Sequence, residues 1–197
     1  MNHLDASAYR WLNSLADSTV WAHSAVVAYA KLGIGLFAVL LLATWLVARR
    51  RPDPAPGVAG VVWAGVAVLA ALAVNQLLGH AVGRARPYVA VPNAHLLVST
   101  TRDFSFPSDH TAVAAAVAGG IWLIDRRLGA VAAAMALAMA FARVYVGAHY
   151  PGDVLGGLLV GGVVAAVGWI PARHLLTPLA ERASRSPVWA LVTTRRR

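Results

Sequence analysis

The sequence is poor in charged residues and lacks cysteine altogether. Charged side chains make up 13% of the 197 residues, about half the share in a typical soluble domain, whereas 59% are hydrophobic and the mean hydropathy is +0.63. A chain of this size cannot hide so much apolar surface from water, so we expect a lipid bilayer to be its solvent. Because cysteine is absent, the composition gives no indication of the redox compartment.

Internal repeats and low-complexity segments are also absent, which favours one membrane domain. The formal net charge is +9 at pH 7. In a soluble protein this excess would suggest nucleic acid binding, but in a membrane protein the positions of the arginines report topology instead. We therefore expect membrane lipids, and no nucleic acid, among the partners. The sequence does not indicate the oligomeric state.

Five apolar segments are candidates for membrane helices, each of which needs about 20 mostly apolar residues. The segments are 25–48, 57–82, 111–124, 128–142 and 154–170. The third and fourth are short, but polar motif residues extend each of them at one end. Glycines in and just before the last segment give it a small-residue face for close helix packing: Gly152, Gly156, Gly157, Gly161 and Gly162. The sequence predicts an all-α, polytopic membrane helix bundle with about five transmembrane helices.

The N-terminal segment has an amphipathic pattern. Apolar residues recur there at helical spacing, at Leu4, Ala8, Trp11, Leu12 and Leu15. Polar residues fill the other face, so the pattern predicts a short helix in the membrane interface, with a soluble cap helix as the alternative. The expected domains are an interfacial helix over residues 1–24, a membrane domain over 25–175 and a basic cytoplasmic tail over 176–197.

Alternation of the five spans sorts the basic residues between two sides of the membrane. One side holds Arg49, Arg50, Arg51, Arg126, Arg127, Arg173, Arg182, Arg185 and Arg195, Arg196 and Arg197. The other side holds Arg84, Arg86, Arg102 and Arg143, with Arg10 and Lys31 near the N-terminal end. Because positive residues favour the cytoplasm, we expect a multi-pass cell-membrane protein whose second group faces the periplasm or outer side.

Three polar clusters interrupt the apolar pattern, at residues 84–87, 106–110 and 143–153. The alternation of spans places all three on the outer side of the membrane. Ionisable groups at membrane depth are costly, so these clusters indicate a functional site.

The residue types in these clusters suit phosphoryl transfer. Arginine forks match phosphate oxygens bidentately, and Ser108 with the backbone N–H groups at the start of a helix forms a phosphate seat. His110 and His149 are available for proton transfer or attack, while Asp153 is placed to orient the ring of His149. Histidines and aspartates could instead hold a divalent ion, but three arginines at the same place would repel it. No metal or cofactor is therefore expected.

The clusters resemble the motifs of the type 2 phosphatidic-acid phosphatase superfamily. The family pattern is a lysine, six residues and Arg-Pro; then Pro-Ser-Gly-His; then Ser-Arg, five residues, His, three residues and Asp. The resemblance implies that His149 attacks phosphorus and becomes a phosphohistidine, that Asp153 positions and activates it, and that His110 protonates the leaving oxygen and then assists water. It also implies that the phosphate oxygens are held by Arg86, Ser108 and Arg143.

The chain departs from this pattern at three positions. Gly79 stands at the lysine position, Asp109 at the motif glycine and Ala142 at the serine before the arginine. The missing lysine leaves one phosphate contact unassigned, and we expect Arg84, the nearest in sequence, to supply it. The alternatives are Arg102, His80 and Lys31. We expect Asp109 among the substrate-binding residues, with an arginine to offset its charge beside a bound phosphate; alternatively, it simply favours the positive helix end.

Within the superfamily, segments 11–16, 75–79, 84–87 and 105–110 are similar to bacterial undecaprenyl-diphosphatases. This resemblance implies hydrolysis of undecaprenyl diphosphate, the C55 lipid carrier of cell-wall peptidoglycan synthesis, to undecaprenyl phosphate and phosphate. The alternatives that keep the chemistry are phosphatidic acid and phosphatidylglycerol phosphate as substrates. A non-enzymatic lipid-phosphate binder or transporter is the alternative of another class, and it does not need the two histidines at family spacing.

Overall fold

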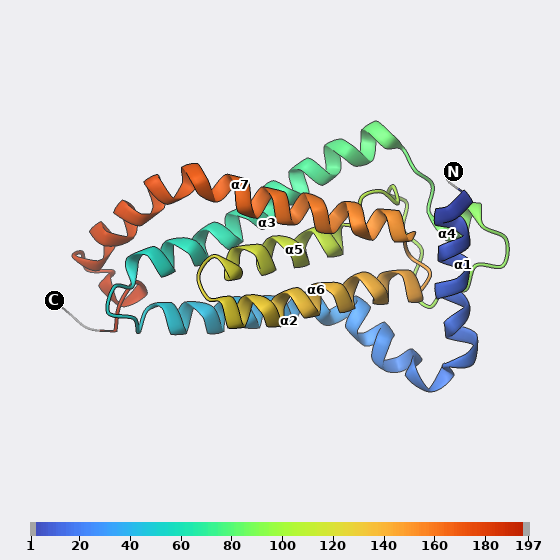
Figure 1. Cartoon of the computed structure of the whole chain (residues 1–197), viewed down its shortest axis with the longest axis horizontal. Helices are drawn as coiled ribbons and strands as arrows, with labels where there is room; N and C mark the ends of the chain where they lie inside the picture. Colours follow the sequence, from blue (N-terminus) through green and yellow to red (C-terminus); the bar gives the residue numbers. More distant parts are fainter. Residues whose placement is uncertain (1–2, 195–197) are drawn as a thin grey trace.

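The computed structural model describes residues 3–194, which are mostly α-helical. The helices are α1 His3–Ser18, η1 Val20–Ala22, α2 His23–Ala48, α3 Ala55–Val82, α4 Pro87–Ala90, α5 Asp109–Trp122, α6 Arg126–Tyr145, α7 Pro151–Ser184 and η2 Trp189–Leu191. No β-strand occurs within the described range, and the predicted all-α class is confirmed. Five helices, α2, α3, α5, α6 and α7, run along the long axis, and α1 lies across one end (Figure 1).

Four segments are long and apolar enough to cross a membrane, which makes the chain a multi-pass membrane protein. They are Val20–Ala48, Ala55–Ala90, Arg126–Tyr145 and Pro151–Ser184. Large apolar side chains cover their outward surfaces; Leu69, Leu137 and Leu159 are 69%, 64% and 67% exposed. An apolar surface of this extent suits contact with lipid rather than with water.

The remaining predicted span, α5, is shorter and lies inside the bundle. Its 14 residues extend for about 21 Å, and nine of them are buried. Small residues allow α3 and α7 to pack closely around it: Gly120 lies directly against Ala64, and Gly161 lies against the carbonyl of Ala112. The predicted small-residue face of α7 is thus confirmed at Gly161, whereas Gly162 faces open space.

The helix α7 is longer than predicted. Its apolar run indicated an end near Ile170, but the helix continues to Ser184 through Pro171 and Pro178, so that boundary was wrong. Each proline removes one backbone N–H donor and favours bending, and α7 curves toward its C-terminal end in Figure 1. Apolar packing against the ends of α2 and α3 compensates, through a buried cluster of Ala48, Ala55, Val58, Ala59, Ala180 and Val192.

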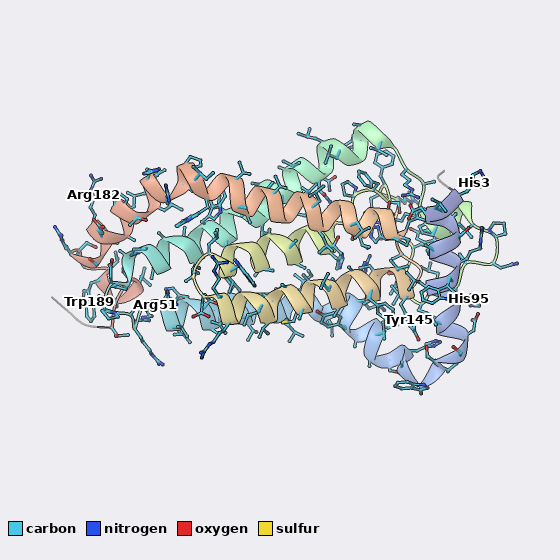
Figure 2. The ribbon with its side chains drawn as sticks, viewed as in Figure 1. His3, Arg51, His95, Tyr145, Arg182 and Trp189 are labelled. Carbon is cyan, nitrogen blue, oxygen red and sulfur yellow. The ribbon has the colours of Figure 1, made fainter. Side chains whose placement is uncertain are left out.

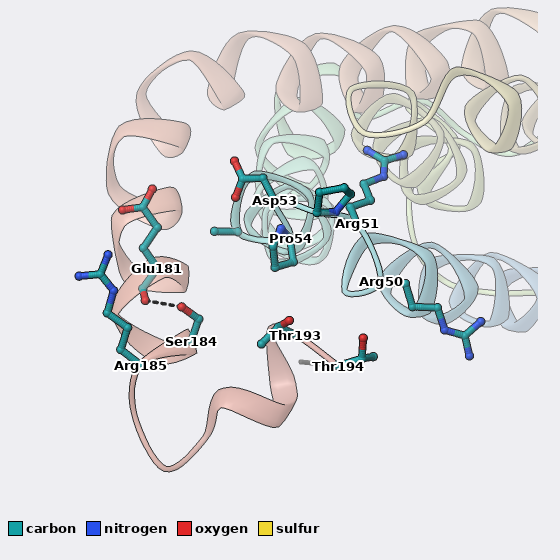
Figure 3. A pocket seen from close by; sticks show the side chains of 11 residues that line it. Arg50, Arg51, Asp53, Pro54, Glu181, Ser184, Arg185, Thr193 and Thr194 are labelled. Atoms are coloured by element: carbon teal, nitrogen blue, oxygen red, sulfur yellow. Dashed lines mark hydrogen bonds between the residues drawn. The ribbon is translucent and has the colours of Figure 1, made fainter. Parts of the chain in front are cut away.

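The two ends of the bundle differ in character. Arg51 and Arg182 lie at the end near the C-terminus, and His3, His95 and Tyr145 at the other (Figure 2). At the arginine-rich end, a mixed-charge cavity of about 540 Å³ lies between the α2–α3 connection and the end of α7 (Figure 3). Residues 195–197, which complete the predicted arginine side, lie outside the described residues, and the division at residue 175 stays a prediction.

The N-terminal helix α1 caps the opposite end. Asn13, one of the polar residues between the apolar positions of this helix, is buried: its Nδ2 donates to the carbonyls of His95 (2.9 Å) and Tyr145 (3.0 Å). The backbone N–H of His95 donates to Asn13 Oδ1 at 2.9 Å. The apolar Leu4 and Trp11 point outward, 78% and 67% exposed. The sequence pattern allowed either an interfacial helix or a cap, and α1 does cap this end of the bundle. That α1 also lies in the membrane interface stays a prediction.

Candidate active site

The three polar clusters predicted to meet do so at the end of the bundle covered by α1. Five of the predicted site residues line one cavity of about 420 Å³, and they come from separate parts of the chain: Arg86, Asp109, His110, Arg143 and His149. The other walls are formed by α3 and by the loop between α4 and α5, through Asn75, Gln76, Gly79, His80, Thr101, Arg102, Asp103, Phe104, Phe106 and Pro107. Ser108 and Asp153 lie buried behind these walls.

A tight turn over residues 146–150 carries His149. Gly147 adopts a φ of +82°, a left-handed conformation that favours glycine, and a side chain there would overlap the carbonyl of His95. The backbone N–H of Leu97 donates to the carbonyl of Val146 at 3.0 Å. The turn and the loop before α5 therefore hold each other in place, and His149 is only 2% exposed.

The hydrogen bonds of His149 define its tautomer. Nδ1 lies 2.8 Å from the carbonyl oxygen of Ser105, and Nε2 lies 3.1 Å from Nη1 of Arg86. A carbonyl oxygen can only accept and a guanidinium can only donate, so Nδ1 carries the hydrogen and Nε2 keeps its lone pair. The imidazole thus presents the Nε2 lone pair to the cavity, next to the guanidinium of Arg86.

Asp153 acts on this histidine differently from what the sequence predicted. The closest approach of its carboxylate to His149 Nδ1 is 3.7 Å, too long for the expected orienting hydrogen bond. The Nδ1–H is instead held by the carbonyl of Ser105, whose hydroxyl donates to Asp153 Oδ2 at 2.5 Å. Asp153 Oδ2 also accepts from the backbone N–H of Tyr150 at 2.9 Å, as part of the cap of α7. Ser105, to which the sequence assigned no role, therefore bridges the pair.

The surroundings of His149 keep it neutral. Burial is the largest effect and lowers the pKa of His149 below its ordinary value; the Asp153 carboxylate opposes this, while the charges of Arg86 and Arg143 add to it. A neutral imidazole is the form that can attack an electrophile. The same carboxylate, 3.7 Å from Nδ1, is placed to stabilise a positive charge on the ring.

Arg86 is held from two sides. Its Nη1 donates to the carbonyl of Ala148 at 3.0 Å, and its Nε and Nη2 donate to the two carboxylate oxygens of Asp103 at 3.2 and 2.9 Å. Burial alone would raise the pKa of Asp103, but hydrogen bonds from Thr101 and Arg86 and the charge of Arg86 outweigh it, so that pKa lies below its ordinary value. A carboxylate therefore occupies the bidentate fork that the sequence assigned to phosphate.

Three buried polar atoms in this region have no hydrogen-bond partner among residues 3–194: Oδ1 of Asn75 and, on two of the predicted phosphate ligands, Nε of Arg143 and Oγ of Ser108. The Nη1 of Arg143 donates only to the carbonyl of Ala30, at 3.4 Å. A buried donor without a partner costs about 1–3 kcal/mol. Both side chains were predicted to hold phosphate oxygens, and an anion in the cavity would supply Arg143 with the missing acceptor.

Arg84 lies apart from the cavity, contrary to the prediction that it replaces the family lysine. Its Nη1 donates to Asp153 Oδ1 at 2.8 Å and its Nη2 donates to Asp5 Oδ2 at 2.6 Å. Its guanidinium also lies 3.9 Å from the centre of the Tyr150 ring. Two carboxylates and an aromatic ring thus engage this side chain, and the nearest basic residue in sequence is not the nearest to the cavity.

Asp109 and His110 begin α5 at the edge of the cavity. The carboxylate of Asp109 accepts from Nδ2 of Asn75 at 2.7 Å and from Nε2 of Gln76 at 3.3 Å. Amide groups of α3, rather than the expected arginine, thus engage this carboxylate. The ring of His110 makes no hydrogen bond within the described range, so both its nitrogens are available to a substrate. No cluster of three His, Asp or Glu residues within 3–194 could hold a metal ion.

Comparisons with known proteins agree with this geometry. A model of the PAP2 superfamily matches residues 60–173. The chain is 31% identical to undecaprenyl-diphosphatase BcrC of Bacillus subtilis over 90% of this chain and 88% of the relative. It is 31% identical to the putative undecaprenyl-diphosphatase YbjG of Escherichia coli over 89% and 88%. Its fold is similar to that of a transmembrane PAP2-type phosphatidylglycerolphosphate phosphatase from Bacillus subtilis, with a TM-score of 0.65, 21% identity and 89% coverage of each chain.

Proposed function

Because the chain belongs to the PAP2 superfamily and is a membrane phosphatase, as its motifs predicted, we propose that it hydrolyses undecaprenyl diphosphate to undecaprenyl phosphate and phosphate. Membership of a hydrolase family sets aside the non-enzymatic binder or transporter. One observation carries the proposed chemistry: a neutral His149 whose Nε2 lone pair lies beside Arg86 in a cavity that Arg143 also lines.

The proposed reaction has two steps. Nε2 of His149 forms a bond to the terminal phosphorus, the bond from phosphorus to the bridging oxygen breaks, and His110 donates a proton to that oxygen. A phosphohistidine and the lipid monophosphate result. In the second step His110 takes a proton from water, the water oxygen bonds to phosphorus, and the P–N bond breaks to release phosphate and restore His149.

The arginines and Ser108 stabilise the charge that develops on phosphorus. As substrate enters, the guanidinium of Arg86 leaves Asp103 and Nε2 of His149 and binds phosphate oxygens. A phosphate oxygen also becomes the missing acceptor for Nε of Arg143. During attack the ring of His149 becomes cationic, and the Ser105 carbonyl together with the Asp153 carboxylate stabilises it.

The cavity also supports a diphosphate over a phosphomonoester. Of the four candidates for the missing lysine contact, Arg84 is engaged elsewhere and Lys31 does not line the cavity. Arg102 and His80 both line it, and Arg102 has no ion pair or hydrogen bond within residues 3–194. These two side chains are available for the phosphate that stays on the lipid, while Arg86 and Arg143 hold the one that leaves.

The proposed orientation places this cavity at the outer face of the membrane. Arg51, which follows α2, and Arg182, near the end of α7, lie at the opposite end of the bundle (Figure 2). Arg126 and Arg127 begin α6 at the same end, directly after Asp125, which pairs with Arg51. Because positive residues favour the cytoplasm, that end is the cytoplasmic one. Impermeant thiol labelling of single cysteines, placed at exposed Arg102 and exposed Arg182 of this cysteine-free chain, tests the orientation in intact cells.

A competition assay tests the substrate. Purified protein in detergent receives undecaprenyl diphosphate and phosphatidic acid at equal concentration, and phosphate release from each is followed. We expect the diphosphate to be consumed faster; faster release from phosphatidic acid would contradict the choice of lipid. His149→Ala should abolish turnover and the covalent labelling of protein by substrate with a radioactive terminal phosphate. The matched control, His174→Ala, changes an exposed histidine of α7 and should retain both.

A further inference from the structure

We propose that Asp5 and Arg84 are positioning residues of the active site, through which the N-terminal helix α1 holds Asp153 and keeps it effective as an anion beside His149. The inference rests on the proposed nucleophilic role of His149. The three charged side chains form a continuous chain of ion pairs, from Asp5 to Arg84 and from Arg84 to Asp153, with N–O distances of 2.6 and 2.8 Å.

The guanidinium of Arg84 is fixed on three sides. Separate nitrogens bind the two carboxylates, and the plane of the group lies over the ring of Tyr150, 3.9 Å from its centre. Its side chain is only 20% exposed, and that of Asp5 is 14% exposed. Charge-assisted hydrogen bonds shielded from water in this way are stronger and more directional than surface ion pairs.

Asp5 also binds the backbone of the first turn of α7. Its Oδ1 accepts from the backbone N–H of Gly152 at 2.8 Å, one of the donors that a helix N-terminus leaves without an intrahelical partner. Asp153 is the next residue along the chain. A side chain at Gly152 would come within 2.9 Å of Asp5 Oδ2, so the glycine leaves room for this contact. One carboxylate thus positions both Arg84 and the backbone that carries Asp153.

The balance of charge explains why two carboxylates are needed. Asp153 is fully buried, and a buried carboxylate without a cation nearby is costly, which Arg84 prevents. Arg84 and Asp153 alone would form a neutral pair and would do little for the positive charge on the ring of His149. With Asp5 the group carries one net negative charge, so Asp153 still stabilises the imidazolium from 3.7 Å.

The decisive variant is Asp5→Asn, which keeps the shape of the side chain and removes its charge. We expect kcat to fall about 10- to 100-fold, the range common for residues that orient a functional group, with KM within about twofold because Asp5 does not line the cavity. The matched control is Asp17→Asn on the same helix, whose side chain is 53% exposed and pairs with His95, and it should retain the parent kcat.

A second pair of variants separates positioning from loss of folding. Arg84→Lys keeps a cation for Asp153 and should retain more activity than Arg84→Gln, while thermal unfolding in detergent verifies that each variant is folded. The kinetics are measured on whichever phosphate substrate the parent enzyme turns over, so a wrong choice of lipid would not obscure the result. A parental kcat in Asp5→Asn, or a rise in KM alone, would overturn the inference.

Discussion

Replacing Asp103 with asparagine should make the enzyme bind its substrate more tightly. Asp103 holds the fork of Arg86 through both carboxylate oxygens, so a phosphate group can use that fork only after displacing it. Asparagine keeps the shape but loses the charge and one of the two acceptors. The pKa of Asp103 lies below its ordinary value, so the carboxylate stays ionised, and competes with substrate, throughout the neutral range.

The size of the effect follows from the exposure of the pair. The side chain of Asp103 is 56% exposed, and exposed ion pairs contribute about 0–1 kcal/mol. The upper limit corresponds to about a fivefold change in an equilibrium constant. We therefore expect KM for a short-chain isoprenoid diphosphate, and the inhibition constant of inorganic phosphate, to fall by up to about fivefold. The value of kcat should stay unchanged because Asp103 has already left Arg86 in the reacting complex.

Steady-state kinetics with phosphate as competitive inhibitor measure both constants. Asp53→Asn is the matched control, because it removes an exposed carboxylate from the opposite end of the bundle. If Asp103→Asn lowered kcat and left both constants unchanged, Asp103 would be holding Arg86 in its working position, and the idea of a competing carboxylate would be refuted.

Three further predictions concern specificity, pH and packing. Arg102→Ala should lower kcat/KM for a diphosphate about tenfold more than for a phosphomonoester, whereas Arg102→Lys should stay near the parent value. Equal losses on both substrates would contradict the proposed contact of Arg102 with the second phosphate. Protonated His149 cannot attack and burial lowers its pKa, so kcat/KM should fall with decreasing pH only below about pH 6.5, which a pH profile measures. Gly161→Ala would overlap the carbonyl of Ala112 and should destabilise the protein by about 1–3 kcal/mol, lowering Tm, whereas Gly162→Ala should not.

The helices were predictable to the extent that hydropathy alone defines them. Both ends of α2 and α3 lie within a few residues of the predicted apolar segments. The end of α7 was not predictable from hydropathy, because its prolines and falling hydropathy indicate that the helix stops near Ile170. In the structure, packing of Ala180 against the ends of α2 and α3 stabilises the helix as far as Ser184. That contact joins residues far apart in the sequence, and local patterns carry no information about it.

The candidate site was predictable where short motifs fix local geometry. The turn that carries His149 and the start of α5 that carries His110 are local structures, and membrane alternation was enough to bring them to one end. The partners of the arginines were not predictable, because each depends on distant packing. Arg84 is nearest in sequence to the motif but binds Asp5 across 79 residues, whereas Arg102 reaches the cavity from a loop.

The position of Asp103 suits it both to stabilise the buried arginines in the empty site and to make way for a phosphate. Arg86 and Arg143 are both buried and line the same cavity, where their like charges repel and each guanidinium loses hydrogen bonds to water. A carboxylate on Arg86 relieves that repulsion, and its exposed position lets it leave when a stronger anion arrives. A diphosphate brings more negative charge than a single carboxylate and can also reach the unpartnered Nε of Arg143. In the proposed mechanism, the group that stabilises the arginines before binding is also the group that the substrate displaces. A variant that strengthened its hold on Arg86 should therefore gain stability and lose affinity for phosphate.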